Sequence, residues 1–102
     1  MEKEKAEVIY TSNDTVGIRI VRENNIEIVT LEVRKGGFIA EHRLPVDITF
    51  YVNDGLGELT VEDEKMIIEK GEKIFVQNGK MRKWINIGDG NLVIVGVKYF
   101  NE

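Results

Sequence analysis

Two stretches of this chain decide its fold: GGFIAEHRLPVDITFYVNDG at residues 36–55 and GEKIFVQNGKMRKWIN at residues 71–86. Glycine begins both stretches and ends the first, at Gly36, Gly71 and Gly55, and Gly79 and Asn86 follow in the second. Glycine is favoured where a turn needs a positive φ or where segments pack closely. The spacing therefore predicts short strands separated by tight turns at these points.

Apolar residues recur at every second position, which is the period of a strand with one buried face. Ile48, Phe50 and Val52 show this pattern. Strands are predicted near residues 7–10, 16–22, 26–34, 38–43, 47–53, 57–62, 65–70, 73–77, 82–87 and 91–99. No stretch of about a dozen residues carries a helical stripe. Many short strands with regular turns predict an all-β sandwich or barrel.

The two stretches resemble the paired motifs of the cupin family. The first motif has a glycine, two histidines, a glutamate and a glycine, at positions held here by Gly36, His42, Leu44, Ile48 and Gly55. The second has glycine, proline, glycine, histidine and asparagine, at positions held here by Gly71, Gln77, Gly79, Arg82 and Asn86. The resemblance implies an RmlC-like jelly-roll barrel, a double-stranded β-helix. We expect one domain over residues 1–102, with motifs at 36–55 and 71–86 and a loosely ordered tail at 1–6.

The resemblance also implies where a metal would bind. Cupins commonly hold a transition metal through the two histidines, the glutamate and the later histidine, because imidazole and carboxylate are suitable donors. Here Leu44 and Ile48 offer only hydrocarbon, and Arg82 brings a permanent positive charge. His42 alone is not a metal site. We therefore predict a degenerate site that holds no metal and no other cofactor.

Two neighbouring carboxylates are the alternative ligands. Glu41 and Asp47 each lie one residue from a family position, and a single step along a strand turns a side chain to the opposite face. Both are therefore expected to face away from the interior. A bulge near Pro45 would shift the register and bring Asp47 inward.

The candidate ligand pocket consists of residues on the interior side of the motif strands, namely His42, Arg82, Trp84, Phe50, Leu44 and Ile48. The three apolar side chains at 44, 48 and 50 favour a fuller and drier core than an open polar pocket. Two interpretations of Arg82 remain open. It either reaches the rim and pairs with a surface carboxylate, or it joins His42 in binding the carboxylate or phosphate of a small ligand.

Three functions follow from these interpretations. The preferred one is a metal-free module that binds a small, anionic ligand or a partner. The alternative is a metal-independent isomerase or epimerase on a sugar or other anionic molecule, with His42 as base and Arg82 as anion clamp. The third is a structural subunit with a filled barrel. An open cavity that reaches both residues would favour a ligand or catalysis. Whether the chain is an enzyme stays open.

Composition limits the partners. The formal net charge of -4 gives no basic field for phosphates, so nucleic acid is not expected. The chain has no cysteine and no apolar run approaching 18 residues, so we expect no membrane span and a cytoplasmic location. The final strand, Asn91 to Phe100, is apolar on both faces. Its outer face needs a cover, either the N-terminal segment of the same chain or a second copy, and we predict a homodimer through this strand.

Overall fold

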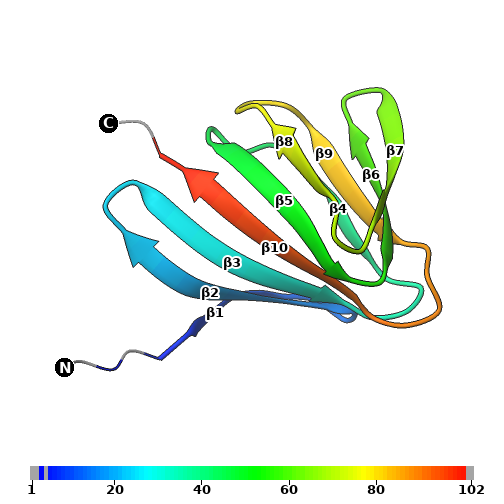
Figure 1. The fold of residues 1–102 in the computed structure, drawn as a ribbon, viewed down its shortest axis with the longest axis horizontal. Coiled ribbons are helices and arrows are strands. Elements are labelled where there is room, and N and C mark those ends of the chain that lie inside the picture. Colours follow the sequence, from blue (N-terminus) through cyan, green and yellow to red (C-terminus); the bar gives the residue numbers. More distant parts are fainter. Residues whose placement is uncertain (1–2, 4, 101–102) are drawn as a thin grey trace.

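The computed structural model describes residues 3 and 5–100, which form two β-sheets that face each other (Figure 1). The strands are β1 Glu7–Thr11, β2 Thr15–Glu23, β3 Ile26–Val33, β4 Phe38–His42, β5 Asp47–Asp54, β6 Leu56–Val61, β7 Glu64–Glu69, β8 Lys73–Val76, β9 Arg82–Asn86 and β10 Leu92–Tyr99. Each predicted strand is present, and its bounds lie within one residue of the prediction. Within the described residues no helix could cross a membrane.

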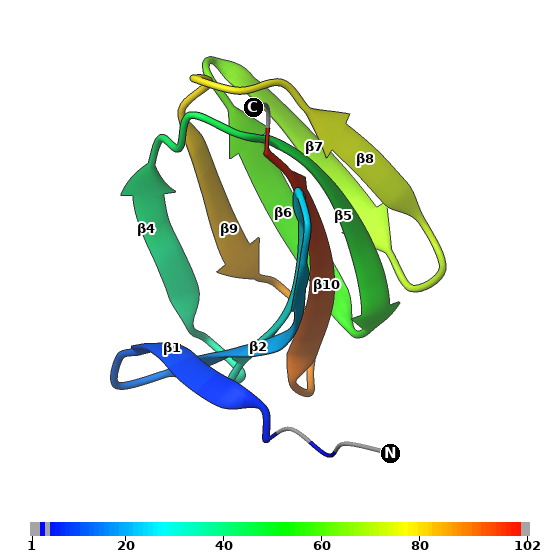
Figure 2. The same ribbon diagram turned by 90° about the vertical axis from the view of Figure 1, so that its left-hand side faces the viewer.

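The strands pair antiparallel in two sheets. One has the order β1-β2-β3-β10-β5-β8, and the other has the order β4-β9-β6-β7. Figure 2 shows the second sheet lying across from β10 and β5, with β1 and β2 curving beneath β4. This is the predicted jelly-roll architecture, in which each sheet buries one face against the other.

The core fills the space between the sheets. Val33, Leu59, Leu92 and Ile94 are fully buried there, and Trp84 is 1% exposed. They alternate along their strands with residues that face outward, as the period-two pattern predicts. Fully burying a side chain of this kind contributes about 1.5–3 kcal/mol relative to leaving it exposed.

Glycines of the two motifs hold the turns. Gly36, Gly55, Gly71 and Gly79 all have positive φ, at 77°, 88°, 89° and 77°. At Gly55 a Cβ atom would also lie 2.5 Å from the carbonyl oxygen of Asn91. The prediction that these positions need glycine for their backbone geometry is confirmed.

Asn86 connects three loops at the end of the barrel. Its side-chain Nδ2 donates to the carbonyl oxygens of Val33, Arg34 and Gly90 at 3.0, 3.1 and 2.9 Å, and its Oδ1 accepts from the backbone N–H of Gly88 at 3.0 Å. The residue is buried. The last anchor of the second motif therefore stabilises the fold and takes no part in the interior site.

The final strand, β10, lies in the middle of the six-stranded sheet between β3 and β5. Leu92 and Ile94 face the core, while Val95 and Val97 are half-buried on the outer face. The N-terminal segment does not cover that face as far as it is described, because β1 pairs with β2 at the sheet edge. Of the tail expected at residues 1–6, positions 1, 2 and 4 lie outside the described residues, and the others precede β1.

Candidate ligand-binding site

A cavity of about 390 Å³ opens between the two sheets. It brings together all six residues of the predicted pocket, His42, Leu44, Ile48, Phe50, Arg82 and Trp84. Sequence reasoning missed eight further lining residues, Ile9, Tyr10, Val29, Leu31, Ile39, Ala40, Glu41 and Lys98. The expectation of a fuller core is therefore wrong. The hydrocarbon side chains at positions 44 and 48 line an open, largely apolar cavity without filling it.

Arg82 is the dominant charge of this cavity. Its side chain is 1% exposed, and its Nε and Nη1 atoms are buried with no hydrogen-bond partner in the described chain. No carboxylate of these residues lies within 4.0 Å of it. Removal from water lowers the pKa of the Arg82 guanidinium below its ordinary value. The interpretation in which Arg82 pairs with a carboxylate at the rim is therefore wrong.

Two aromatic side chains stand beside this guanidinium. Phe50 and Trp84 pack edge to face with ring centroids 5.4 Å apart, and the Arg82 Cζ atom lies 5.9 Å from the Phe50 centroid. The indole Nε1 of Trp84 is also buried without a partner in the described residues. Buried donors without acceptors are uncommon in folded proteins. Arg82 and Trp84 thus bring three buried donors without an acceptor in the described residues to the wall of the cavity.

A β-bulge shapes the other wall. Ile39 is in register with Trp84, but the next aligned pair is His42 with Arg82, so β4 has one residue more than β9 between them. A bulge of this kind turns two residues toward one on the partner strand. Ala40, Glu41 and His42 around this bulge all contribute to the cavity lining while remaining exposed. The expectation that the Glu41 side chain faces away from the interior stays a prediction.

The bulge proposed near Pro45 does not bring Asp47 inward. Asp47 is in register with Tyr99 on the outer face of the sheet, and its carboxylate accepts from the backbone N–H and the Nδ2 of Asn78 at 2.8 and 3.1 Å. It caps the turn after β8 and has no part in the cavity. That alternative ligand is excluded by the register of β5.

His42 is exposed at the mouth of the cavity, and on β4 it is in register with Arg82 on the adjacent strand β9. Its Nδ1 lies 3.0 Å from the carbonyl oxygen of Ala40. A carbonyl oxygen only accepts, so Nδ1 carries the proton of this bond. The neutral ring therefore has its lone pair on Nε2, which makes no hydrogen bond to the described residues. This atom is free to accept a proton from a bound molecule.

The wall opposite His42 carries an ion-pair cluster that the sequence did not reveal. Glu27 is buried on β3 and contacts Lys98 at 3.2 Å, Arg19 at 3.5 Å and Arg22 at 4.0 Å. Lys98 also lines the cavity. Arg19 also pairs with Glu7, so the cluster contains two carboxylates and three cations. Lys98 is the member of this cluster that lines the cavity, and Glu27 balances its charge.

The profile of the family described as "Cupin domain" matches residues 29–98, which is more than half of the chain. The chain belongs to the cupin family. The match covers both motif stretches and all the strands from β4 to β9, and with them most of the cavity. No functionally curated protein matches this cupin.

Solved structures with the same fold are distant in sequence. The cupin domain of Cnp3 from Schizosaccharomyces pombe has a TM-score of 0.81 at 16% identity, over 85% of this chain and 65% of that one. KdgF from Halomonas sp. has a TM-score of 0.79 at 16% identity, covering 97% and 89%. SPY1581 of Streptococcus pyogenes, a protein of unknown function, has a TM-score of 0.78 at 20% identity, over 98% of this chain and 92% of that one. These likenesses show the fold alone.

The residues of this cupin do not fit the family's metal. Leu44 and Ile48 present hydrocarbon to the cavity at two ligand positions, and a third holds the unpaired guanidinium of Arg82. A cation placed among them would meet a like charge in a site of low dielectric, where repulsion is strong. Within residues 3 and 5–100, no three His, Asp or Glu side chains are grouped as metal ligands. We derive no metal chemistry from this site.

Proposed function

We propose that this cupin binds a small monoanionic molecule with an apolar body in the cavity of His42 and Arg82, without a metal. The observation that carries the proposal is the unpaired, buried Arg82. A charge removed from water is stable in a protein only with a compensating partner, and the described chain supplies none. A bound anion would supply it.

The lining of the cavity supports a carboxylate over a phosphate ester. A single buried guanidinium compensates one negative charge, whereas a phosphate monoester carries about 1.5–2 negative charges near neutral pH. Most of the wall is hydrocarbon, from Val29, Leu31, Ile39, Leu44 and Ile48. A volume of about 390 Å³ falls within the usual size of small-molecule sites. The best-matched ligand is a carboxylic acid with a compact aliphatic or aromatic body.

A thermal-shift series tests this proposal directly. Acetate, butyrate, benzoate and inorganic phosphate are compared at equal ionic strength, because a ligand that binds only the native state raises its melting temperature. We expect the rise to grow from acetate to benzoate as more apolar surface is buried. Equal responses to all four anions, or none, would refute the proposed ligand class.

An enzymatic version of this site is the second candidate. His42 and Arg82 are in register on adjacent strands and both line the cavity, and the Nε2 atom of His42 has no partner in the described residues, so a base and an anion clamp would stand side by side. Such an enzyme would isomerise or epimerise an anionic substrate, such as a sugar acid, held by Arg82. The open cavity gives no support to the third candidate, a structural subunit with a filled barrel.

Deuterium exchange separates binding from catalysis. Sugar acids are incubated with the protein in D₂O, and proton NMR follows the signal of the carbon next to the carboxylate. A base at His42 predicts exchange that His42→Gln removes while ligand binding persists. If the wild-type protein binds these acids and exchanges no proton, the enzymatic candidate is rejected and the binding function stands.

We also propose that two copies associate through the outer face of the six-stranded sheet. The face carries an apolar group that spans four neighbouring strands: Ile26 and Ile28 on β3, Val95, Val97 and Tyr99 on β10, Tyr51 on β5 and Phe75 on β8. Four of these, at 26, 51, 75 and 99, are exposed, at 38–57%. Sheet faces of this kind are commonly covered by another layer.

The Val97→Glu substitution tests the dimer. Val97 lies near the centre of this face, so a carboxylate there should break the association and leave a folded single chain. Light scattering coupled to size exclusion measures the mass, and far-UV circular dichroism checks the fold. Ile67→Glu is the matched control, because Ile67 is exposed on the other sheet. A wild-type mass of one chain at micromolar concentration would contradict the proposal.

A further inference from the structure

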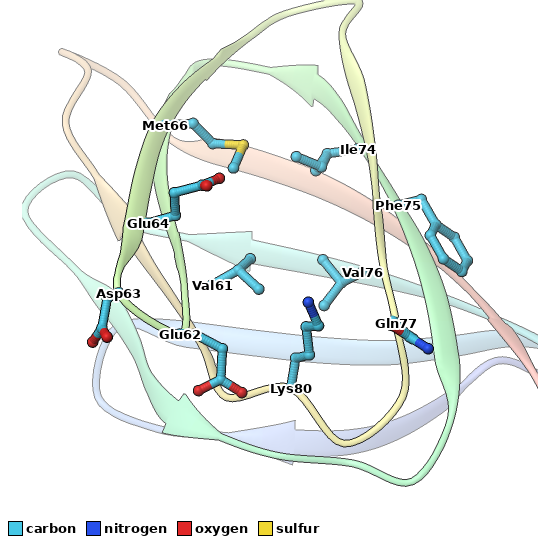
Figure 3. A pocket seen from close by; sticks show the side chains of 10 residues that line it. All are labelled: Val61, Glu62, Asp63, Glu64, Met66, Ile74, Phe75, Val76, Gln77 and Lys80. Atoms are coloured by element: carbon cyan, nitrogen blue, oxygen red, sulfur yellow. The ribbon is translucent and has the colours of Figure 1, made fainter.

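A second groove, of about 610 Å³, is lined by residues of β6, β7 and β8 (Figure 3), and β7 and β8 lie on the side of the barrel away from β1 and β4 (Figure 2). It runs between the tip of the β6–β7 hairpin, strand β8 and the loop at residues 77–81. Its lining residues are Val61, Glu62, Asp63, Glu64, Met66, Ile74, Phe75, Val76, Gln77 and Lys80. None of them takes part in the anion cavity. The groove is therefore a separate site.

The groove lies where the two sheets end. Strand β7 is last in the four-stranded sheet and pairs only with β6, and β8 is last in the six-stranded sheet and pairs only with β5. An edge strand presents unpaired N–H and C=O groups that can pair with another chain. Both free edges face the groove.

The edge of β8 is the more open of the two. The N–H of Val52 on β5 donates to the carbonyl oxygen of Glu72 at 3.0 Å. Along an antiparallel ladder every second residue is hydrogen-bonded to the partner strand, so Ile74 and Val76 are the next residues of β8 bonded to β5. The backbone N–H and C=O groups of Lys73 and Phe75 therefore point away from β5, toward the open edge. On β7, by contrast, the N–H of Glu69 is already bound by the Glu72 carboxylate at 2.7 Å. An added strand would therefore pair with β8.

The floor of the groove is apolar. In Figure 3 the side chains of Met66 and Ile74 point toward one another across it, and Val61 and Val76 do the same lower down. Val76 is buried, and the other three are half-buried. Side chains of a strand alternate in direction, so every second residue of a strand beside β8 would lie over this floor.

Charge at the hairpin tip is acidic. Glu62, Asp63 and Glu64 lie there, and Lys80 is the one basic residue among the lining residues. Figure 3 shows Glu64 and Lys80 pointing into the groove and Asp63 pointing away. Glu62 already accepts from the backbone N–H of Met81 at 3.2 Å. A cationic side chain at this end of the groove would be attracted to Glu64.

We propose that this groove docks an extended peptide segment, which adds as a strand to the edge of β8. Alternate apolar side chains of the segment cover Met66 and Ile74, and a lysine or arginine at one end lies against Glu64. This mode of recognition derives affinity from main-chain hydrogen bonds and specificity from the pockets for alternate side chains. It is independent of the anion cavity.

The probe is a blocked peptide of sequence KTVTVTS, whose lysine and two valines share one face of an extended strand, titrated into ¹⁵N-labelled protein and followed by NMR. Saturable shifts are expected at the amides of Lys73 and Phe75. The Glu64→Lys variant should weaken binding at least about tenfold, which corresponds to about 1.4 kcal/mol. Asp63→Lys is the matched control, with the same charge change on a side chain directed away, and should retain the wild-type affinity within about threefold.

Three results would overturn the proposal. An N-methylated peptide that binds equally well would exclude strand pairing. Peptide shifts confined to the cavity of Arg82, or no saturation, would exclude the groove. Shifts of the Lys73 and Phe75 amides that depend on protein concentration without peptide, and that persist in the Val97→Glu variant, would show that a second copy occupies the edge. Benzoate should leave the chemical shifts of the Lys73 and Phe75 amides unchanged. A failure of the peptide proposal can therefore be distinguished from a failure of the anion-binding proposal.

Discussion

Replacing Arg82 with methionine is expected to raise the free energy of unfolding and to abolish anion binding in the same variant. Arg82 is buried with unpaired Nε and Nη1 atoms, so the native state bears an uncompensated desolvation cost. Methionine keeps a similar length and has no charge to desolvate. Apolar replacement of buried charges is often neutral or stabilises by about 1–4 kcal/mol, and we expect a gain within this range.

The loss of binding should be large because each charge-assisted hydrogen bond contributes about 1.5–3 kcal/mol. Two such bonds to a carboxylate, partly offset by desolvation of the ligand, lead us to expect at least about a hundredfold weaker binding of benzoate. Isothermal calorimetry measures the affinity, and urea denaturation without ligand measures the stability. A destabilised Arg82→Met protein would show that the arginine has a structural partner.

Lys98→Met is the matched control for this experiment. It removes the same charge from the same cavity, but Lys98 is paired with the buried Glu27 at 3.2 Å. The variant removes the shortest ion pair of Glu27 and leaves it only the longer contacts with Arg19 and Arg22, so this variant should lose stability. If the free energy of unfolding rises in Arg82→Met and falls in Lys98→Met, the unsatisfied charge is located at Arg82. If it changes in the same direction in both variants, any cation in the cavity behaves alike.

The strands and turns of this cupin could be predicted from the sequence because local rules determine them. A period of two is visible in Ile48, Phe50 and Val52, and all three are buried. The glycines of the motifs were expected at turns, and Gly55 shows why: a positive φ and a close backbone neighbour exclude other residues. Such features depend on a few neighbouring residues, which the sequence displays directly.

The interior site could be predicted only in part, because its details depend on the register between distant strands. The bulge between Ile39 and His42, where β4 borders the cavity, has no marker in the sequence near Ala40. The depth of Arg82 depends on how closely two sheets approach. A long side chain on a strand can reach solvent or remain inside, and the sequence pattern is the same in both cases.

The groove at β7 and β8 was not predicted for a related reason. Val61 and Met66 alternate like any core residues, and the pattern does not reveal that the two sheets diverge there. Which strand forms a sheet edge follows from topology, because β7 and β8 are adjacent in sequence but belong to different sheets. Sites between sheet edges therefore need coordinates.

Asn86→Ala is expected to cause the largest loss of stability among the substitutions considered. The variant removes the donor for the carbonyls of Val33, Arg34 and Gly90 and the acceptor for the Gly88 N–H. Each buried group left unpaired costs about 1–3 kcal/mol, and water can reach part of this loop end, so we expect a total loss of about 3 kcal/mol. Urea denaturation analysed by linear extrapolation measures it.

Two further variants test the hydrogen-bond explanation for Asn86. Asn86→Asp has nearly the same shape but exchanges the donor for an oxygen that faces three carbonyls, so it should be at least as unstable as the alanine variant. Asn91→Ala removes an exposed asparagine whose Nδ2 bonds Glu32 at 2.9 Å, and should change stability by at most about 0.5 kcal/mol. If Asn86→Asp retained wild-type stability, packing of the side chain would explain the need for this shape at position 86, and the donor bonds that join the three loops would contribute little.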